Sequence, residues 1–149
     1  MPQSLAQIYI HLVFSTKDRV PQISAEVQPR LHAYLAGTCQ AIHCDALVVG
    51  GVADHVHLLF RLARTTSLSD AVKNIKVESS KWMKTDAGVP DFAWQAGYGA
   101  FSIGASQVDE VTDYIRRQAE HHAKRGFQEE FRLLLKRYGV KYDEAYVWD

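Results

Sequence analysis

The stretch Ala53-Asp54-His55-Val56-His57-Leu58-Leu59-Phe60 decides the fold, because its alternating pattern predicts a β-strand. Side chains alternate between the two faces of a strand, so His55 and His57 share one face. The opposite face is apolar and consists of Val56, Leu58 and Phe60. Two imidazoles on one face, two residues apart, can bind one metal ion. The strand is therefore both a core element and a candidate site.

The residues on either side of this strand predict a simple order of elements. Apolar alternation indicates strands, and periods near 3.6 residues indicate helices. Gly50-Gly51 is a turn signal that predicts a hairpin between the second and third strands. The predicted elements are a strand at Ile8–Phe14, a helix from Ser24 to about His43, strands at Cys44–Gly51 and 53–60, a helix at Leu68–Lys84, a strand at Tyr98–Ile103, and helices at Gln107–Lys124 and Phe127–Tyr138.

Helix ends are marked by short polar side chains and by glycine. Ser67 or Ser69 is expected to cap the second helix, and Ser106 the third. Gly126 is expected to end the third helix. Residues 85–97 contain glycine and proline and are predicted to form a loop.

This order of elements predicts an α+β fold in a single domain spanning residues 1–149. Strand, helix and strand repeated twice is the split βαβ, ferredoxin-like arrangement, an antiparallel sheet with two helices on one face. The apolar strand face, Ile8 included, should face those helices. His55, His57 and His11 should lie on the opposite face, which the helix at Gln107–Lys124 is expected to cover.

Composition limits the class of protein. The chain has 149 residues, 47% of them hydrophobic, with a net charge of zero, which argues against a protein that coats nucleic acid indiscriminately. No apolar run approaches the length of a membrane helix, and no signal peptide is evident. Cys39 and Cys44 are expected to be reduced, buried thiols in a cytoplasmic protein.

The helix after residue 106 carries two stripes when placed on a helical wheel. Tyr114 and Gln118, one turn apart, begin a polar row that continues with His121 and Arg125 at the edge of the buried face. The packing stripe consists of Val108, Val111, Ile115, Ala119 and His122. A polar row at such an edge suits a nucleophile and a ligand.

Each of these features also has an ordinary structural explanation. A His-x-His pair can be two polar residues on an exposed strand face, and a helical tyrosine is commonly half-buried packing. His121 and His122 could ligate metal, although histidines near a helix C-terminus also suit its dipole. Together, a histidine pair, a tyrosine and a helical glutamine suggest metal-assisted cutting of a phosphodiester by a tyrosine nucleophile.

Four stretches, in order, resemble the single-tyrosine HUH transposases of bacterial insertion sequences and their REP-associated relatives. The resemblance covers residues 8–125. The stretches are Tyr9 to Arg19, Asp54 to Leu59, Trp94 with Gly97 to Ile103, and Val111 to Gln118 with His121-His122.

The resemblance implies that His55, His57 and Gln118 bind a divalent metal, Mg²⁺ or Mn²⁺, and that Tyr114 is the nucleophile. It implies single-stranded DNA cleavage and strand transfer through a 5′-phosphotyrosine intermediate, at element ends that contain hairpins. It also implies a homodimer, in which the tyrosine helix of one subunit can serve the histidines of the other.

The DNA is expected to be held by basic side chains on its phosphates. The candidates, which an ordinary solvated surface would also explain, are Lys17, Arg19, Lys73, Lys76, Lys81, Arg116 and Arg117. Three alternatives stay open at the level of sequence. They are a domesticated relative that cuts REP hairpins, a non-catalytic binding module for DNA hairpins or for a small ligand, and a metal phosphodiesterase that uses water.

Overall fold

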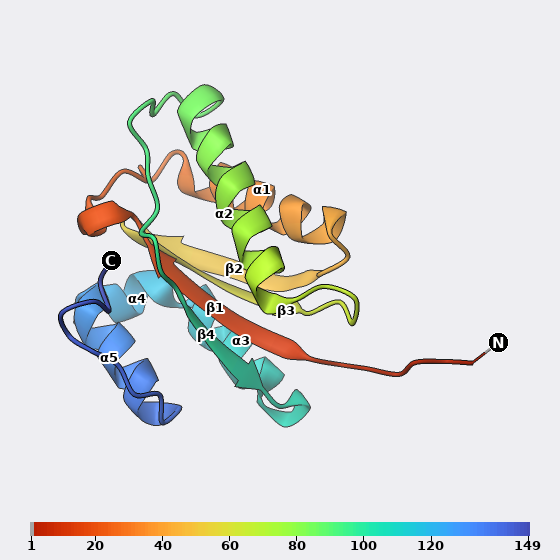
Figure 1. The fold of residues 1–149 in the computed structure, drawn as a ribbon. Helices are drawn as coiled ribbons and strands as arrows, with labels where there is room; N and C mark the ends of the chain where they lie inside the picture. Colours follow the sequence, from red (N-terminus) through yellow and green to blue (C-terminus); the bar gives the residue numbers. More distant parts are fainter. Residues whose placement is uncertain (1) are drawn as a thin grey trace.

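The structure is a computed structural model that describes residues 2–149. It contains the predicted βαββαβ order followed by further helices (Figure 1). The strands are β1 (Tyr9–Ser15), β2 (Ala46–Val52), β3 (His55–Arg61) and β4 (Gly99–Ile103). The helices are α1 (Gln28–Ala41), α2 (Leu68–Thr85), α3 (Val108–Arg116), α4 (Gln118–His122) and α5 (Phe127–Arg137), with 3₁₀ turns η1 (Lys17–Arg19) and η2 (Ala105–Gln107).

The four strands form one antiparallel sheet in the order β2-β3-β1-β4. The ferredoxin-like α+β fold predicted from the sequence is therefore confirmed. Strand β3 lies between β2 and β1, with His57 opposite Val13 of β1 and Gly50 of β2. A histidine on this inner strand is shielded from water on both sides, provided that helices cover both faces of the sheet.

Helices do cover both faces (Figure 1), α1 and α2 on one and α3, α4 and α5 on the other. The main apolar core lies under α1 and α2, and it contains the even-numbered side chains of β1 and β3 as predicted. These are Ile10, Leu12, Phe14, Val56, Leu58 and Phe60. The exception is Ile8, which precedes β1 and is 44% exposed.

The hairpin between β2 and β3 turns later than predicted. Gly50 and Gly51 belong to β2, and the turn is made by Ala53 and Asp54. Gly50 is instead a point of close approach, because a Cβ added there would lie 2.8 Å from Cγ2 of Ile115 in α3. Gly51 has φ of +148°, a conformation that L side chains rarely adopt.

The prediction of one continuous helix from Gln107 to Lys124 is wrong. The helix breaks at Arg117, which has φ of −100° and ψ of 24° and separates α3 from α4. Beyond the break the predicted stripes no longer hold, since Gln118 is buried and Ala119 is exposed. Before the break, Val111 and Ile115 pack on the sheet as expected.

Two expectations about helix caps have different outcomes. The Ser67 hydroxyl accepts a hydrogen bond from the backbone N–H of Asp70 at 3.1 Å, and so caps α2. Ser106 does not cap a helix, because it lies within η2 and Gly104 precedes that turn.

Both cysteines, Cys39 and Cys44, are free and buried, as expected. Among the described residues, no helix is both long and apolar enough to cross a membrane.

Candidate active site

The site is built on the inner strand of the sheet. His55 and His57 are both fully buried, on the face covered by α3, α4 and α5. His11 of β1 stands beside them, and its Nε2 lies 2.8 Å from Nδ1 of His57. The carboxylate of Asp54 accepts a hydrogen bond of 2.7 Å from Nδ1 of His55. These contacts fix both rings and direct the Nε2 atoms of His55 and His57 toward the helical layer.

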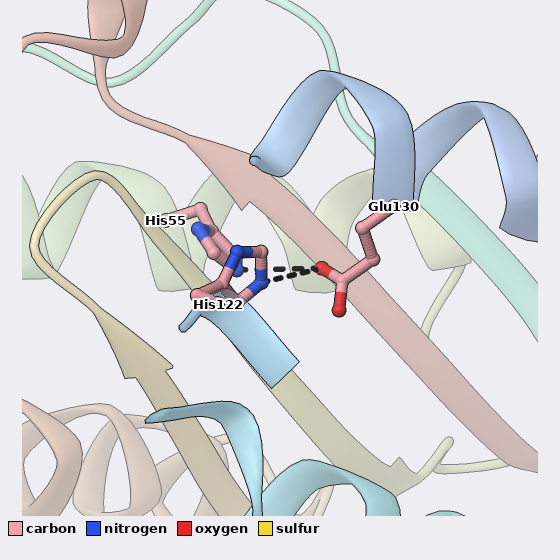
Figure 2. Close-up of side chains that lie close together, drawn as sticks. All are labelled: His55, His122 and Glu130. Atoms are coloured by element: carbon pink, nitrogen blue, oxygen red, sulfur yellow. Dashed lines mark ion pairs between the residues drawn. The ribbon is translucent and has the colours of Figure 1, made fainter. Parts of the chain in front are cut away.

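The carboxylate of Glu130, from α5, lies at the centre of the site. Its Oε1 lies 3.0 Å from Nε2 of His57, 3.4 Å from Nε2 of His55 and 3.1 Å from Nε2 of His122. Figure 2 shows the rings of His55 and His122 directed at the same oxygen of Glu130. Glu130 is only 2% exposed, so one buried carboxylate is surrounded by three imidazoles.

The other oxygen of Glu130 serves the tyrosine helix. The hydroxyl of Tyr114 donates a hydrogen bond to Oε2 of Glu130. The side-chain amide of Gln118 donates to the same oxygen at 3.1 Å, and its carbonyl accepts from Nε2 of His55 at 3.0 Å. The break at Arg117 makes this possible, because it turns Gln118 into the site while α3 ends with Tyr114 already facing the histidines.

The structure therefore brings together all four residues singled out for chemistry, His55, His57, Tyr114 and Gln118, within one chain. Their assigned roles stay predictions. Sequence reasoning missed Glu130, although a signal was present. Glu130 occupies a position in the apolar stripe of α5, where the neighbouring buried residues are Phe127, Phe131, Leu134 and Leu135.

Burial and close charges shift the pKa values of the site in opposite directions. Burial lowers the pKa of His11 to about 3 and that of His57 to about 4, so both rings are neutral at pH 7. Burial acts the same way on His55, but its contacts with Asp54 and Glu130 prevail and raise its pKa to about 9.

The pKa shifts favour the charged form of Glu130 and the neutral form of Tyr114. Burial alone would raise the pKa of Glu130, but the imidazoles of His122, His55 and His57 around it lower that pKa well below its usual range. Burial and the adjacent Glu130 carboxylate raise the pKa of Tyr114. The site thus presents a permanent carboxylate beside a protonated phenol at neutral pH.

The donor set fits a divalent metal. His55, His122 and Glu130 offer three ligand atoms that all lie within 4.8 Å of one another. Ligands about 2.1 Å from an ion in octahedral geometry lie about 3.0 Å apart, close to the separations around Oε1 of Glu130. Nε2 of His122 is buried and has no hydrogen-bond partner, although it lies 3.1 Å from that oxygen.

A cleft of about 200 Å³ opens beside Tyr114. The ring of His121 stacks on the Tyr114 ring at 4.6 Å, and Tyr138 stacks on Phe101 nearby. The wall carries both charge signs, with Glu110 and Asp113 opposed by Arg117 and Arg137. Tyr114 is therefore reachable from solvent, while His55 and His57 are fully buried and do not line the cleft.

The basic residues predicted to hold DNA lie on different sides of the molecule. Lys73, Lys76 and Lys81 belong to α2, on the face of the sheet opposite the site. The ammonium of Lys76 donates to the backbone carbonyls of Gln95, Ala96 and Gly97, at 2.6 to 3.2 Å, which gives it a structural task.

The other basic candidates lie nearer the tyrosine helix or the C-terminal segment. Arg116 and Arg117 end α3, and Arg117 pairs with Glu120 at 2.9 Å. Lys17 and Arg19 lie in η1, where the guanidinium of Arg19 sits 5.7 Å from the centre of the Trp148 ring. DNA contact by any of these residues stays a prediction.

Fold and site together define an α+β domain in which a buried histidine pair on the sheet faces a helix that carries a tyrosine. Comparison with known proteins gives the family. The family described as "Transposase IS200 like" matches residues 4–118, so the chain belongs to the IS200-like transposases and functions as a transposase. The matched region contains His55, His57, Tyr114 and Gln118, but ends before His122 and Glu130.

Curated relatives agree with this assignment. The transposase for insertion sequence element IS200 of Salmonella typhimurium strain LT2 is 26% identical over 116 residues, which are 74% of this chain and 76% of that protein. The corresponding protein of Salmonella typhi matches to the same extent.

Solved structures show the same fold. A transposase candidate from Deinococcus radiodurans R1 superposes with a TM-score of 0.62 at 21% identity, covering 79% of this chain and 98% of that one. The REP-associated tyrosine transposase bound to a REP hairpin superposes with a TM-score of 0.60 at 14% identity, covering 82% and 73%.

Proposed function

We propose that this transposase cuts and rejoins single-stranded DNA in a metal-dependent reaction, with Tyr114 as the nucleophile and a 5′-phosphotyrosine intermediate. The observation that carries the proposal is the sharing of one carboxylate. Glu130 contacts the Tyr114 hydroxyl through one oxygen and the two strand histidines through the other. The candidate nucleophile and the candidate metal-binding histidines thus contact the same carboxylate.

The metal, Mg²⁺ or Mn²⁺, would be held by His55, His57 and Gln118, and it would neutralise the scissile phosphate and stabilise the charge that develops there. The protein residues around it have distinct tasks. Asp54 orients His55 by accepting a hydrogen bond from its Nδ1, and His11 orients His57 through the hydrogen bond between Nε2 of His11 and Nδ1 of His57. The helical layer keeps water away from the histidines, and this strengthens each electrostatic contact inside the site.

The chemistry at Tyr114 follows from its protonated phenol. As Oη of Tyr114 forms a bond to phosphorus, the bond from phosphorus to the 3′-oxygen breaks; the phenolic proton passes to water, and the departing 3′-oxygen takes up a proton from water. The products are a 5′-phosphotyrosine link and a free 3′-hydroxyl. The energy of the phosphodiester is retained in the link, so a 3′-hydroxyl can attack it in reverse and rejoin a strand without ATP.

The substrate is single-stranded DNA with hairpins at the ends of a mobile element. The cleft beside Tyr114 has a volume of about 200 Å³ and leads to a recessed hydroxyl, which a phosphate inside a regular duplex would not reach. The REP-associated transposase of similar fold was solved bound to a REP hairpin, which supports a hairpin as the recognised feature.

The test is a denaturing gel after incubation with Mn²⁺ and labelled single-stranded DNA that carries the hairpins flanking the gene. We expect a slowly migrating protein–DNA adduct that is absent with a chelator and with Tyr114→Phe. Cleavage without an adduct would indicate a phosphodiesterase that uses water. Hairpin binding without cleavage would indicate a non-catalytic binding module.

The homodimer implied by the family resemblance is part of the proposal. The contacts of Gln118 with His55 and of Tyr114 with Glu130 and His57, all within one chain, support a site that is complete in each subunit. Sedimentation at tens of micromolar would detect the dimer. A monomer at that concentration would contradict it.

A further inference from the structure

The residues beyond the family match are not peripheral to the site. His122 in α4 and Glu130 in α5 follow Gln118, the last residue matched, yet both side chains point into the histidine cluster (Figure 2). The imidazole of His122 packs against that of His55, with ring centres 4.4 Å apart. The ring of Phe127 lies 4.6 Å from that of His55, so the N-terminal turn of α5 is packed onto the metal-binding strand.

From this geometry we propose that Glu130 joins the two halves of the active site, as a metal ligand with His122 through Oε1 and as the positioning residue for Tyr114 through Oε2. The inference rests on the proposed function, since it presupposes a metal centre and a tyrosine nucleophile. It adds two ligands and assigns a task to the C-terminal helices. Under this proposal α5 supplies an active-site residue in addition to covering one face of the sheet.

The ligand half of the proposal rests on distances and burial. Oε1 of Glu130 is between 3.0 and 3.4 Å from three Nε2 atoms that come from β3 and α4. Imidazole nitrogens, the amide of Gln118 and water alone would give a divalent ion no negative ligand. Glu130 is the one carboxylate among the described residues that contacts all three rings, and hard divalent cations prefer carboxylate oxygen.

The positioning half rests on the second oxygen. The Tyr114 hydroxyl donates to Oε2, and the amide of Gln118 donates to the same atom at 3.1 Å. A tyrosine side chain has two free torsions, so a single fixed acceptor at its tip determines where the hydroxyl lies. Glu130 thereby holds the attacking oxygen at a set distance from the metal-binding atoms. Orientation of this kind can supply several powers of ten in rate.

The ligand role and the positioning role can be tested separately, because only the ligand role is assigned to His122. His122 contacts His55 and Glu130, whereas the hydroxyl of Tyr114 is bonded to Glu130. Loss of His122 should therefore weaken metal binding alone. Loss of the Glu130 charge should weaken metal binding and should also misplace the tyrosine.

The experiment measures Mn²⁺ binding to the full-length protein by calorimetry, and separately the rate of adduct formation at saturating Mn²⁺. The variants are Glu130→Gln, which keeps the side-chain volume, and His122→Gln. The control is Glu129→Gln, because Glu129 is exposed on the adjacent position of the same helix. Circular dichroism and urea unfolding establish that each variant is folded.

We expect Mn²⁺ affinity to fall at least about tenfold in both Glu130→Gln and His122→Gln, and to be unchanged in Glu129→Gln. At saturating Mn²⁺, His122→Gln should recover the wild-type rate and Glu130→Gln should remain at least about tenfold slower. If Glu130→Gln fails to fold, the affinity of His122→Gln still decides the ligand half.

Wild-type affinity in Glu130→Gln would overturn the inference and leave the proposed function intact. Full recovery of the Glu130→Gln rate at saturating Mn²⁺ would overturn the positioning half. A wild-type protein that binds no Mn²⁺ would overturn the inference and the proposed function together. A wild-type protein that binds Mn²⁺ and forms no adduct would overturn the proposed function, and with it the positioning half.

Discussion

The contact between Gly50 of β2 and α3 sets the height of the tyrosine helix above the sheet. A Cβ at position 50 would lie 2.8 Å from Cγ2 of Ile115 and closer still to the Ile115 carbonyl oxygen. The carbonyl belongs to the backbone of α3, so a rotamer change cannot relieve the overlap. Gly50→Ala must therefore lift α3, and Tyr114 is the residue immediately before Ile115.

The size of the effect follows from ordinary contact distances. Unstrained contacts to carbon begin at about 3.4 Å, so α3 must move by about 1 Å. Overpacking of this kind costs about 1–3 kcal/mol of unfolding free energy. A displacement of about 1 Å at a nucleophile can lower the rate about a hundredfold. Mn²⁺ affinity should change less than the rate, because two of the three proposed ligands, His55 and His57, lie on β3 and do not move with α3.

The assay is single-turnover adduct formation with labelled hairpin DNA at saturating Mn²⁺, together with urea unfolding. The matched control is Gly37→Ala, because Gly37 is exposed in α1 and an added Cβ there meets nothing within 4 Å. That control should keep the wild-type rate and gain a few tenths of a kcal/mol to about 1 kcal/mol in stability. A Gly50→Ala protein with wild-type rate and stability would refute the reasoning.

Three further predictions concern other parts of the molecule. Asp54→Asn should lower Mn²⁺ affinity about 10- to 100-fold in calorimetry, because Asp54 orients His55 through Nδ1 at 2.7 Å, and unchanged affinity would contradict this. Lys76→Gln should lower the free energy of unfolding by about 1–2 kcal/mol, because three backbone carbonyls lose a charged donor, whereas the exposed Lys73→Gln should be neutral in the same urea titration. If Lys76→Gln also leaves the salt dependence of hairpin binding unchanged, Lys76 is removed from the predicted DNA contacts. Burial lowers the pKa of His32, so below about pH 6.5 this residue takes up a proton in the unfolded protein while it stays neutral in the folded protein. The unfolding free energy of the wild type should therefore fall more between pH 7 and pH 5 than that of His32→Gln. Equal losses in the two proteins would argue against this pKa shift.

The sheet was predictable because its signal is local. A strand alternates with a period of two, and the even-numbered apolar residues of β1 and β3 mark one face unambiguously. The two histidines then had to share the other face. The order of elements restricts the topology further, so the ferredoxin-like arrangement followed from the sequence alone.

The helical layer was less predictable for two physical reasons. The break at Arg117 occurs without glycine or proline, so no local signal shows that Gln118 turns inward and Ala119 outward. Glu130 occupies a core position in α5, which marks it as unusual, but its partners lie on β3, α3 and α4. A carboxylate whose neighbours come from three other elements is identified only when those elements are placed in space.

The most direct test of the central claim is to locate the covalent link. After reaction with Mn²⁺ and hairpin DNA, the protein is digested with nuclease and protease, and the peptides are sequenced by mass spectrometry. The account predicts a nucleotide 5′-phosphate attached to Tyr114, only when metal is present. A link to any other residue, or cut DNA with no linked peptide, would contradict it.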